Sequence, residues 1–441
     1  AKMSSWCLLQ VFVATVCFPQ TLTALQLPSA LLARDSFLKY ATAAAFLTPS
    51  IPTSLTSSSS IESASANSVT KEMERAQETT TSLPSRVAYR STSIPVSLID
   101  QSNSEKVNVQ VPVAIWYPSP SSDASSSLPS TRSDISSTNV VQYKHHISVA
   151  KIGTLLAGWN LPQFLKREFS LTPTTFSEED GDATTRGSTI SIVDGTTIPL
   201  PASGPVVLLA HGYLGSRFDL SHLAESLASR GFICISPEYP ESLAASYKKV
   251  PGLDRSIITS QLLQSLSADW KVQGTKFGIV GHSLGCGTAM TSGDKSWTRV
   301  CIAGFPGERD EKTAGGNVLF ISSVNDGAVS IQRIESAIPR DFVRWNEDDT
   351  TTVMMKGKKT DIPRRTALIF ENRETAPNHI SYLAENVNEA MMSFLSPLLP
   401  VANALSIPVL DFDKYQQSRD SKRTAKIVIP LVREYLMQEM L

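Results

Sequence analysis

Basic clusters and long apolar runs are both scarce in this sequence of 441 residues, and each scarcity argues against a class of protein. Lys and Arg number 40 against 41 Asp and Glu, and no stretch gathers them into a block. Because nucleic acids are bound through concentrated positive charge, we expect no nucleic acid partner. A run long enough for a transmembrane helix is missing outside the N-terminus, and the apolar stretch there is short.

Cysteine is also rare, with five residues in the chain. Cys7 and Cys17 lie in the N-terminal apolar stretch, whereas Cys234, Cys286 and Cys301 lie in or beside apolar runs. None of them has the spacing of a metal site. We therefore expect small buried thiols, with neither a disulfide framework nor a metal, and no other cofactor.

The N-terminal 85 residues have the composition of targeting sequence. Residues 1–24 hold one lysine, then an apolar stretch, then small residues, which predicts a signal peptide cleaved near Ala24. Residues 25–85 are rich in Ser, Thr and Ala and poor in acids, which predicts a disordered segment. This segment is either a spacer in a secreted protein or the transit part of a bipartite plastid signal, so both destinations stay open.

Residues 86–441 read as one domain in which strands alternate with helices. Residues 107–119 alternate apolar and polar positions and predict a strand. Unbroken apolar strands are expected near 204–210, 232–240, 276–283, 298–305, 317–326 and 364–370, and helices at 221–231, 255–270, from about 284, and at 421–441. Such strands predict a doubly wound, mostly parallel sheet covered on both faces, which is an α/β fold.

Residues 119–200 interrupt this alternation as a loop and a lid-like insert. Ile152, Leu155, Leu156 and Trp159 have helical spacing, which predicts either a helix facing the core or a flap over a site that dips into lipid. Residues 188–201 predict a hairpin.

The segment Gly281–Gly285, with the letters GHSLG, is the candidate centre of chemistry. On its own it could be a glycine-rich turn between a strand and a helix. A Gly-x-Ser-x-Gly sequence placed between a strand and a helix is also typical of a sharp turn that exposes a nucleophilic serine. Here an apolar strand precedes it and a helix follows, so we predict that Ser283 is the nucleophile.

A serine nucleophile needs a base, and the base needs an acid that orients it. His379 is the one histidine after Ser283, and it follows the last predicted strand, so it is the candidate base. Asp326 ends a buried strand and is the preferred acid, with Glu308 and Asp310 in reserve. Whether Asp326 or one of these two is the acid stays open.

Two backbone N–H groups, those of Tyr213 and Leu284, are the candidate oxyanion hole. His211 is expected to shape the loop that carries Tyr213. His145, His146 and His222 are expected to be loop or surface histidines.

These residues, within 210–242 and 278–290, resemble the platelet-activating-factor acetylhydrolase family of α/β-hydrolases. Residues 111–119 are similar to that family's early strand, 147–169 to its lipid-facing helical insert, and 409–436 to its closing segment. The resemblance implies cofactor-free hydrolysis of short or oxidised acyl esters of phospholipids by a serine triad. In that family the triad aspartate follows the strand that matches 299–305, where this chain has Gly304 and Phe305.

Residues 211–238 also look like chlorophyllases, which remove phytol from chlorophyll with the same triad. We therefore expect a serine ester hydrolase that acts on a lipid-like ester and associates with membrane surfaces. A chlorophyllase-like hydrolase in the plastid, a non-catalytic binding protein of the same fold, and an acyltransferase are the alternatives.

Overall fold

The computed structural model of this chain describes residues 86–99, 105–119, 141–148, 151, 166–173, 190–243, 250–304, 316–350, 362–395 and 420–441. Several sequence predictions lie outside these residues: the signal peptide of 1–24, the segment 25–85, the helix around Ile152 to Trp159, and the alternative acids Glu308 and Asp310.

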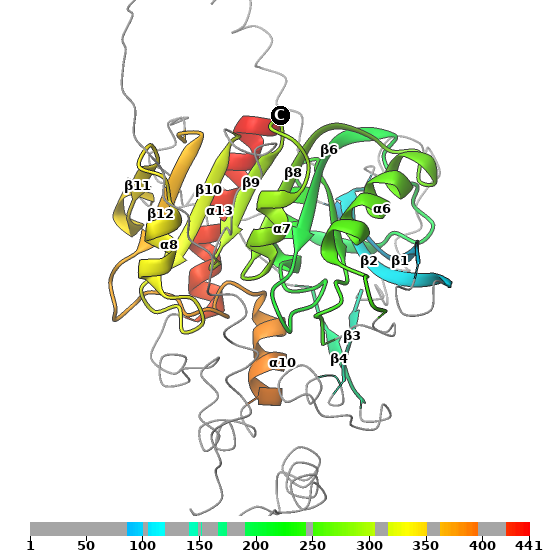
Figure 1. Ribbon diagram of the computed structural model, residues 1–441, viewed down its shortest axis with the longest axis horizontal. Helices are drawn as coiled ribbons and strands as arrows, with labels where there is room; N and C mark the ends of the chain where they lie inside the picture. The colour runs from blue at the N-terminus through cyan, green and yellow to red at the C-terminus, as the bar shows by residue number, and fades with distance from the viewer. Residues whose placement is uncertain are drawn as a thin grey trace, which may run out of the picture. The chain divides into compact units, whose positions relative to one another are not determined.

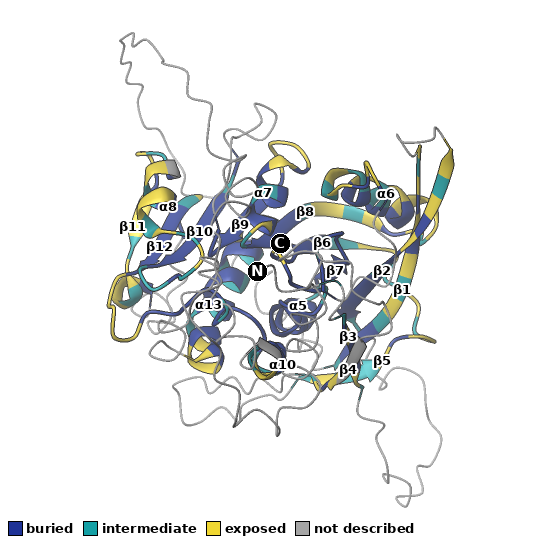
Figure 2. Cartoon of the chain, turned by 60° about the horizontal axis from the view of Figure 1, so that its bottom comes forward, coloured by how far each residue is buried: buried dark blue, intermediate teal, exposed yellow. Residues whose placement is uncertain are grey.

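Most described strands form one large sheet. Its members are β1 (Arg86–Ile99), β2 (Lys106–Pro118), β5 (Ser191–Asp194), β6 (Ser203–Ala210), β7 (Ile233–Pro237), β8 (Gln273–His282), β9 (Thr298–Ile302), β10 (Val318–Ser323), β11 (Val343–Trp345) and β12 (Arg365–Phe370). The ten described strands of this sheet have the order β11-β12-β10-β9-β8-β6-β7-β2-β1-β5 (Figures 1 and 2). All neighbours are parallel, except that β2 is antiparallel to β1 and β7. The predicted mostly parallel sheet is confirmed.

Helices cover both faces of this sheet. One face carries α6 (Arg255–Ala268), α7 (Gly285–Thr291) and α8 (Ile331–Ala337), and the other carries α5 (Ser221–Ala228) and α13 (Ser421–Met440) (Figure 2). A further helix, α10 (Glu385–Leu395), contacts α13. Every residue of β7, β9 and β10 is buried, which explains why these strands are apolar without alternation.

The chain reverses its direction of travel across the sheet at β6. From β6 it passes through α5 to β7 on one side, and then through α6 to β8 on the other side of β6. Loops that leave neighbouring strands toward opposite faces open a crevice at the carboxyl edge of a parallel sheet. The ends of β6 and β8 therefore lie at the position where a doubly wound fold builds its site.

The expected hairpin at residues 188–201 is wrong. β5 is one short strand that pairs in parallel with β1, and the chain then turns at Gly195. A Cβ atom on Gly195 would lie 2.6 Å from the Tyr117 hydroxyl oxygen, and this hydroxyl donates to the Gly195 carbonyl at 2.8 Å. The turn thus closes on β2 rather than on a partner strand of its own.

Within the lid-like insert, the described residues include a small antiparallel pair that the sequence did not predict. β3 (Tyr143–Ser148) pairs with β4 (Lys166–Leu171), and the two strands flank the expected helix. No helix among the described residues is long and apolar enough to cross a bilayer.

Candidate active site

Ser283 lies in a strained turn directly after β8. Its φ angle is +56°, in the left-handed region that side chains other than glycine rarely adopt. A Cβ atom on Gly281 would lie 2.1 Å from the Gly285 carbonyl oxygen, and one on Gly285 would lie 2.0 Å from the Ala210 carbonyl oxygen. Both glycines are therefore required for β8, α7 and the end of β6 to approach this closely.

Ser283, His379 and Asp326 form one hydrogen-bonded chain. The Ser283 Oγ lies 2.8 Å from His379 Nε2. His379 Nδ1 lies 2.9 Å and 3.0 Å from the two carboxylate oxygens of Asp326. Since an ionised carboxylate only accepts, this geometry puts the proton on Nδ1 and leaves Nε2 to accept from the serine hydroxyl. The three residues come from three separate loops that the sequence had placed at the same edge of the sheet.

The structure holds the Asp326 carboxylate in place before any substrate arrives. Its Oδ1 accepts from the backbone N–H groups of Ala328 at 2.9 Å and Val329 at 2.8 Å. Asp326 is buried, and the neighbouring Asn325 donates to the carbonyl oxygens of Arg373 and Ala376, in the loop that leads to His379. The acid and the base are thus fixed to each other through their loops as well as through their side chains.

The candidate oxyanion donors belong to two segments that meet at Ser283, the loop after β6 and the start of α7. Leu284 is the N-cap residue of α7, so its N–H has no partner within that helix. The loop with Tyr213 comes so close to the serine that a Cβ atom on Gly212 would lie 2.9 Å from the Ser283 Cβ. Tyr213 and Leu284 also expose 40% and 43% of their surfaces, which is unusual among the large apolar side chains that the structure describes. We call these two exposed side chains, on the residues that follow Gly212 and Ser283, the apolar rim of the site.

His282 belongs to the site and was missed by the sequence analysis. Its Nε2–H donates to the carbonyl oxygen of His379 at 2.9 Å, and the two ring centroids are 4.9 Å apart. Burial, followed by the charge of His379, lowers the pKa of His282 to about 3, so its ring is neutral and holds its proton on Nε2. The only signal in the sequence was its place inside the Gly-x-Ser-x-Gly segment.

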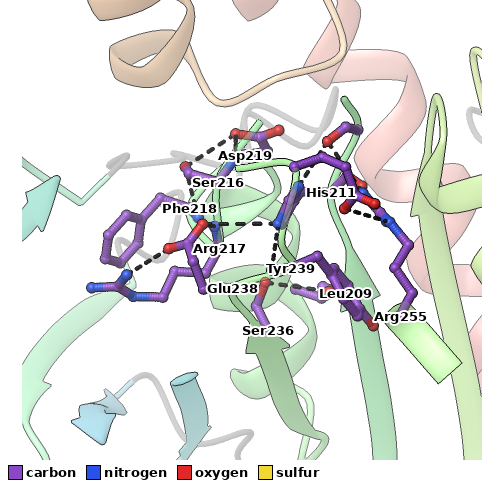
Figure 3. Close-up of polar contacts among 12 residues, drawn as sticks. Leu209, His211, Ser216, Arg217, Phe218, Asp219, Ser236, Glu238, Tyr239 and Arg255 are labelled. Carbon is purple, nitrogen blue, oxygen red and sulfur yellow. Dashed lines mark hydrogen bonds and ion pairs between the residues drawn. The ribbon is translucent and has the colours of Figure 1, made fainter. Parts of the chain in front are cut away.

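His211 is the first residue of the loop that carries Tyr213, and its side chain is buried (Figure 3). Its Nδ1–H donates to the Gly212 carbonyl oxygen at 2.8 Å, and its Nε2 accepts from the Tyr239 N–H at 2.9 Å. Burial is the first cause that lowers the pKa of His211 well below its ordinary value, with the Arg255 charge as the second. The neutral ring is the form that can make both hydrogen bonds.

The expectation that His145 and His222 are loop or surface residues is wrong, whereas His146 is exposed. His145 is one of the buried residues that alternate with exposed ones along β3, and its ring packs against Phe218. His222 lies on α5, all of whose residues are buried. Burial lowers the pKa of His145 to about 3 and that of His222 to about 4. Both rings are therefore neutral parts of the core.

The predicted burial of the cysteines is confirmed for those that the structure describes. Cys234, Cys286 and Cys301 are buried free thiols, and burial raises the pKa of Cys286 well above its ordinary value. Within the described ranges, no group of three His, Cys, Asp or Glu side chains could hold a metal ion.

Among known proteins, this chain is similar to solved structures of esterases and serine hydrolases, at low identity and low TM-score. No family model matches the chain, and no curated protein matches it. Similar solved structures include a ferulic acid esterase from Streptomyces cinnamoneus, at 14% identity over 81% of this chain and 91% of that one, with a TM-score of 0.34. The Pyrococcus furiosus esterase Pf2001 is 14% identical over 44% and 83% of the two chains, with a TM-score of 0.29.

A third structure is XC6422 from Xanthomonas campestris, described as an α/β serine hydrolase without a lid. It is 12% identical over 46% and 86% of the two chains, with a TM-score of 0.26. At such low similarity these structures say nothing of substrate. The strand order, the strained serine and the flanking glycines show on their own that this chain has the α/β-hydrolase fold.

Proposed function

We propose that this protein is a serine ester hydrolase that cleaves an acyl ester of a lipid-like substrate. The observation that carries the proposal is the hydrogen bond of 2.8 Å between Ser283 Oγ and His379 Nε2, on a histidine that Asp326 holds from the other side. A base in hydrogen-bond reach of a serine, oriented by a buried carboxylate, is the arrangement that activates a hydroxyl for acyl transfer.

The first half of the reaction follows from these distances. His379 Nε2 takes the hydroxyl proton as Ser283 Oγ bonds to the ester carbonyl carbon, and the carbonyl oxygen becomes an oxyanion between the N–H groups of Tyr213 and Leu284. When the oxyanion collapses, the bond to the leaving alcohol breaks and His379 gives its proton to that alcohol. Ser283 is then acylated.

Water completes the cycle by the same route. His379 takes a proton from a water molecule, which attacks the acyl carbon, and the proton then returns to Ser283 Oγ as the acid leaves. Each backbone donor of an oxyanion hole contributes about 3 kcal/mol to the transition state. An alcohol in place of water would make the same site an acyltransferase, and product analysis with added alcohol separates the two reactions.

A lipid-like ester is favoured by the apolar rim. Tyr213 and Leu284 each supply a candidate oxyanion N–H from the backbone, and their side chains are exposed large hydrophobic groups. An acyl chain or a long alcohol that lies across Ser283 would cover both side chains and remove their surface from water. This rim, together with the resemblance of residues 111–119 and 210–242, supports an activity like that of the platelet-activating-factor acetylhydrolases.

The test is ester hydrolysis by purified protein with matched substrates. We expect the wild type to hydrolyse a short p-nitrophenyl ester, the Ser283→Ala variant to fall to background, and a fluorophosphonate probe to label Ser283. Failure of the wild type on every ester, with no labelling, would favour a non-catalytic binding protein. Among acetyl-phospholipid, long-chain phospholipid and chlorophyll, we expect the acetyl-phospholipid to be preferred, and preference for chlorophyll would favour the chlorophyllase-like alternative.

We also propose that the protein enters the secretory pathway, because residues 1–24 have the composition of a signal peptide. The apolar residues of the insert support a place of action at a membrane surface. Fluorescent fusions with and without residues 1–85 test the route. Plastid localisation would indicate a bipartite signal, and secretion would indicate a spacer.

A further inference from the structure

Arg255 is the first residue of α6, and its side chain contacts the loop that carries Tyr213. Its Nη1 donates to the His211 carbonyl oxygen at 2.8 Å, and its Nη2 donates to the Gly212 carbonyl oxygen at 3.4 Å (Figure 3). One planar guanidinium group therefore binds two successive carbonyl groups of the same loop, which a single ammonium group cannot do as well.

These contacts fix the direction of a particular peptide group. The Gly212 carbonyl oxygen also accepts from His211 Nδ1–H at 2.8 Å and from the Gly215 N–H at 3.3 Å. In a planar trans peptide, the carbonyl group of one residue and the N–H of the next point in opposite directions. Donors that hold the Gly212 carbonyl group in place therefore also set the direction of the Tyr213 N–H.

The same guanidinium group contacts the element that carries the other candidate donor. Arg255 Nη1 donates to the Thr288 hydroxyl oxygen at 3.3 Å, and Thr288 lies one turn into α7. Leu284 is the N-cap residue of α7. Arg255 is thus bonded both to the loop before Tyr213 and to the helix that begins after Leu284.

Arg255 is itself held in position from two sides. Its Nε donates to Glu241 Oε2 at 3.1 Å, and its guanidinium carbon lies 4.4 Å from the centre of the Tyr239 ring. The side chain is 12% exposed. A group that is fixed before the substrate binds needs no reorganisation when negative charge develops, which is the condition for electrostatic catalysis.

We propose that Arg255 is a positioning residue for the oxyanion hole, which sets the relative placement of the Tyr213 and Leu284 N–H groups by bonding to both of their supporting segments. The inference rests on the proposed serine ester hydrolysis. Arg255 acts only through the carbonyl groups of the loop and the Thr288 side chain of α7, and it does not contact the reacting atoms.

The chain offers a closely matched control in Arg217. Its guanidinium group pairs with Glu238 at 2.6 Å, lies 4.5 Å from the centre of the Phe218 ring and is 13% exposed. Arg217 lies in the same loop as Tyr213, but among the described residues its side chain donates to Glu238 and to no carbonyl group of that loop. Arg255→Lys and Arg217→Lys therefore both replace a planar guanidinium group, in similar surroundings, by an ammonium group. Only Arg255→Lys removes hydrogen bonds to the carbonyl groups of His211 and Gly212.

The experiment compares both variants with the wild type in the full chain. Active-site titration with a fluorophosphonate gives the concentration of competent Ser283, so that misfolded protein is not counted. We then measure kcat and KM for a p-nitrophenyl ester, and the inhibition constant of a trifluoromethyl ketone, whose adduct with Ser283 carries an oxyanion.

Per titrated site, we expect Arg255→Lys to lower kcat about 10- to 100-fold, which is less than the roughly 10²- to 10³-fold loss on removal of a whole donor. KM should change by less than about twofold, and the inhibition constant should rise by the same factor by which kcat/KM falls. Arg217→Lys should keep wild-type values per site.

Equal values for the two variants per titrated site would overturn the inference and leave the proposed function intact. A loss confined to KM, or a fall in kcat with an unchanged inhibition constant, would overturn it as well. A wild type without Ser283-dependent hydrolysis would overturn both the inference and the proposed function.

Discussion

Substitution of Gly285 by alanine should break the serine turn, because the three atoms nearest to the added Cβ are backbone atoms that cannot rotate away. The added Cβ would lie 2.0 Å from the Ala210 carbonyl oxygen and 2.7 Å from its carbon, whereas real Cβ atoms stay at least 3.0 Å from such neighbours. The end of β6 and α7 must therefore separate by about 1.0 Å, the difference between 3.0 and 2.0 Å. Overpacking of this kind costs about 3 kcal/mol of stability.

The same movement should reduce catalysis, since α7 begins after Leu284 and the Tyr213 loop follows Ala210. A misplacement of about 1 Å in a catalytic arrangement costs about 10²-fold in rate. We expect Gly285→Ala to lower the free energy of unfolding in urea by about 3 kcal/mol, and ester hydrolysis per folded molecule by about 100-fold.

Gly287 is the control, two residues further along α7. A Cβ atom there meets nothing within 4 Å. Alanine is favoured over glycine in a helix by about 0.5–1 kcal/mol, so Gly287→Ala should raise the free energy of unfolding by that amount and keep activity. Wild-type stability and activity in Gly285→Ala would refute the reasoning, and so would equal losses in the two variants.

Three further predictions concern the site and its surroundings. Asp326→Asn should lower kcat about 10⁴-fold with unchanged stability, as measured by steady-state kinetics and thermal unfolding, because the amide no longer holds His379 in the correct tautomer. His282→Phe keeps a buried ring but removes the donor to the His379 carbonyl group, so kcat should fall about tenfold while KM stays the same, and unchanged kcat would contradict the positioning contact. Asp219 is buried in the loop before α5, and burial raises its pKa from 3.8 to about 7. The folded state therefore favours the neutral acid, and stability is lost as the pH rises toward 7. Between pH 5 and pH 7 the free energy of unfolding of the wild type should fall by about 2 kcal/mol relative to Asp219→Asn, and a difference independent of pH would contradict the raised pKa.

Local sequence patterns were sufficient to predict the buried strands of the sheet and the positions of the candidate site residues at their ends. The apolar strands are uninterrupted because the sheet buries them on both faces, and the glycines around Ser283 stand where backbones touch. The position of Asp326 at a strand end and of His379 after the last strand followed from the same pattern. These features were predictable because parallel strands bring their carboxyl ends to one edge.

Contacts between residues that are far apart in the sequence could not be predicted from local sequence patterns. His282 bonds to the carbonyl group of a residue 97 positions away, and Arg255 bonds to carbonyl groups 44 and 43 positions away. A hydrogen bond from a side chain to a backbone oxygen far away in the sequence produces no periodic pattern in the sequence around either residue. β1 was also not predicted. Its Ser and Thr residues alternate with apolar ones, as in a half-buried strand, but this pattern is hard to distinguish from the Ser- and Thr-rich segment that precedes it.

The chemistry is tested most directly by trapping the acyl-enzyme. Wild-type protein is mixed with a short p-nitrophenyl ester, quenched in acid within the first turnovers, digested, and examined by mass spectrometry beside the Ser283→Ala variant. We predict an acyl group on the peptide that contains Ser283 in the wild type, and in the variant neither the acyl group nor turnover above background. Turnover that persists in Ser283→Ala, or an acyl group on another residue with Ser283 unmodified, would contradict the assignment of Ser283 as the nucleophile.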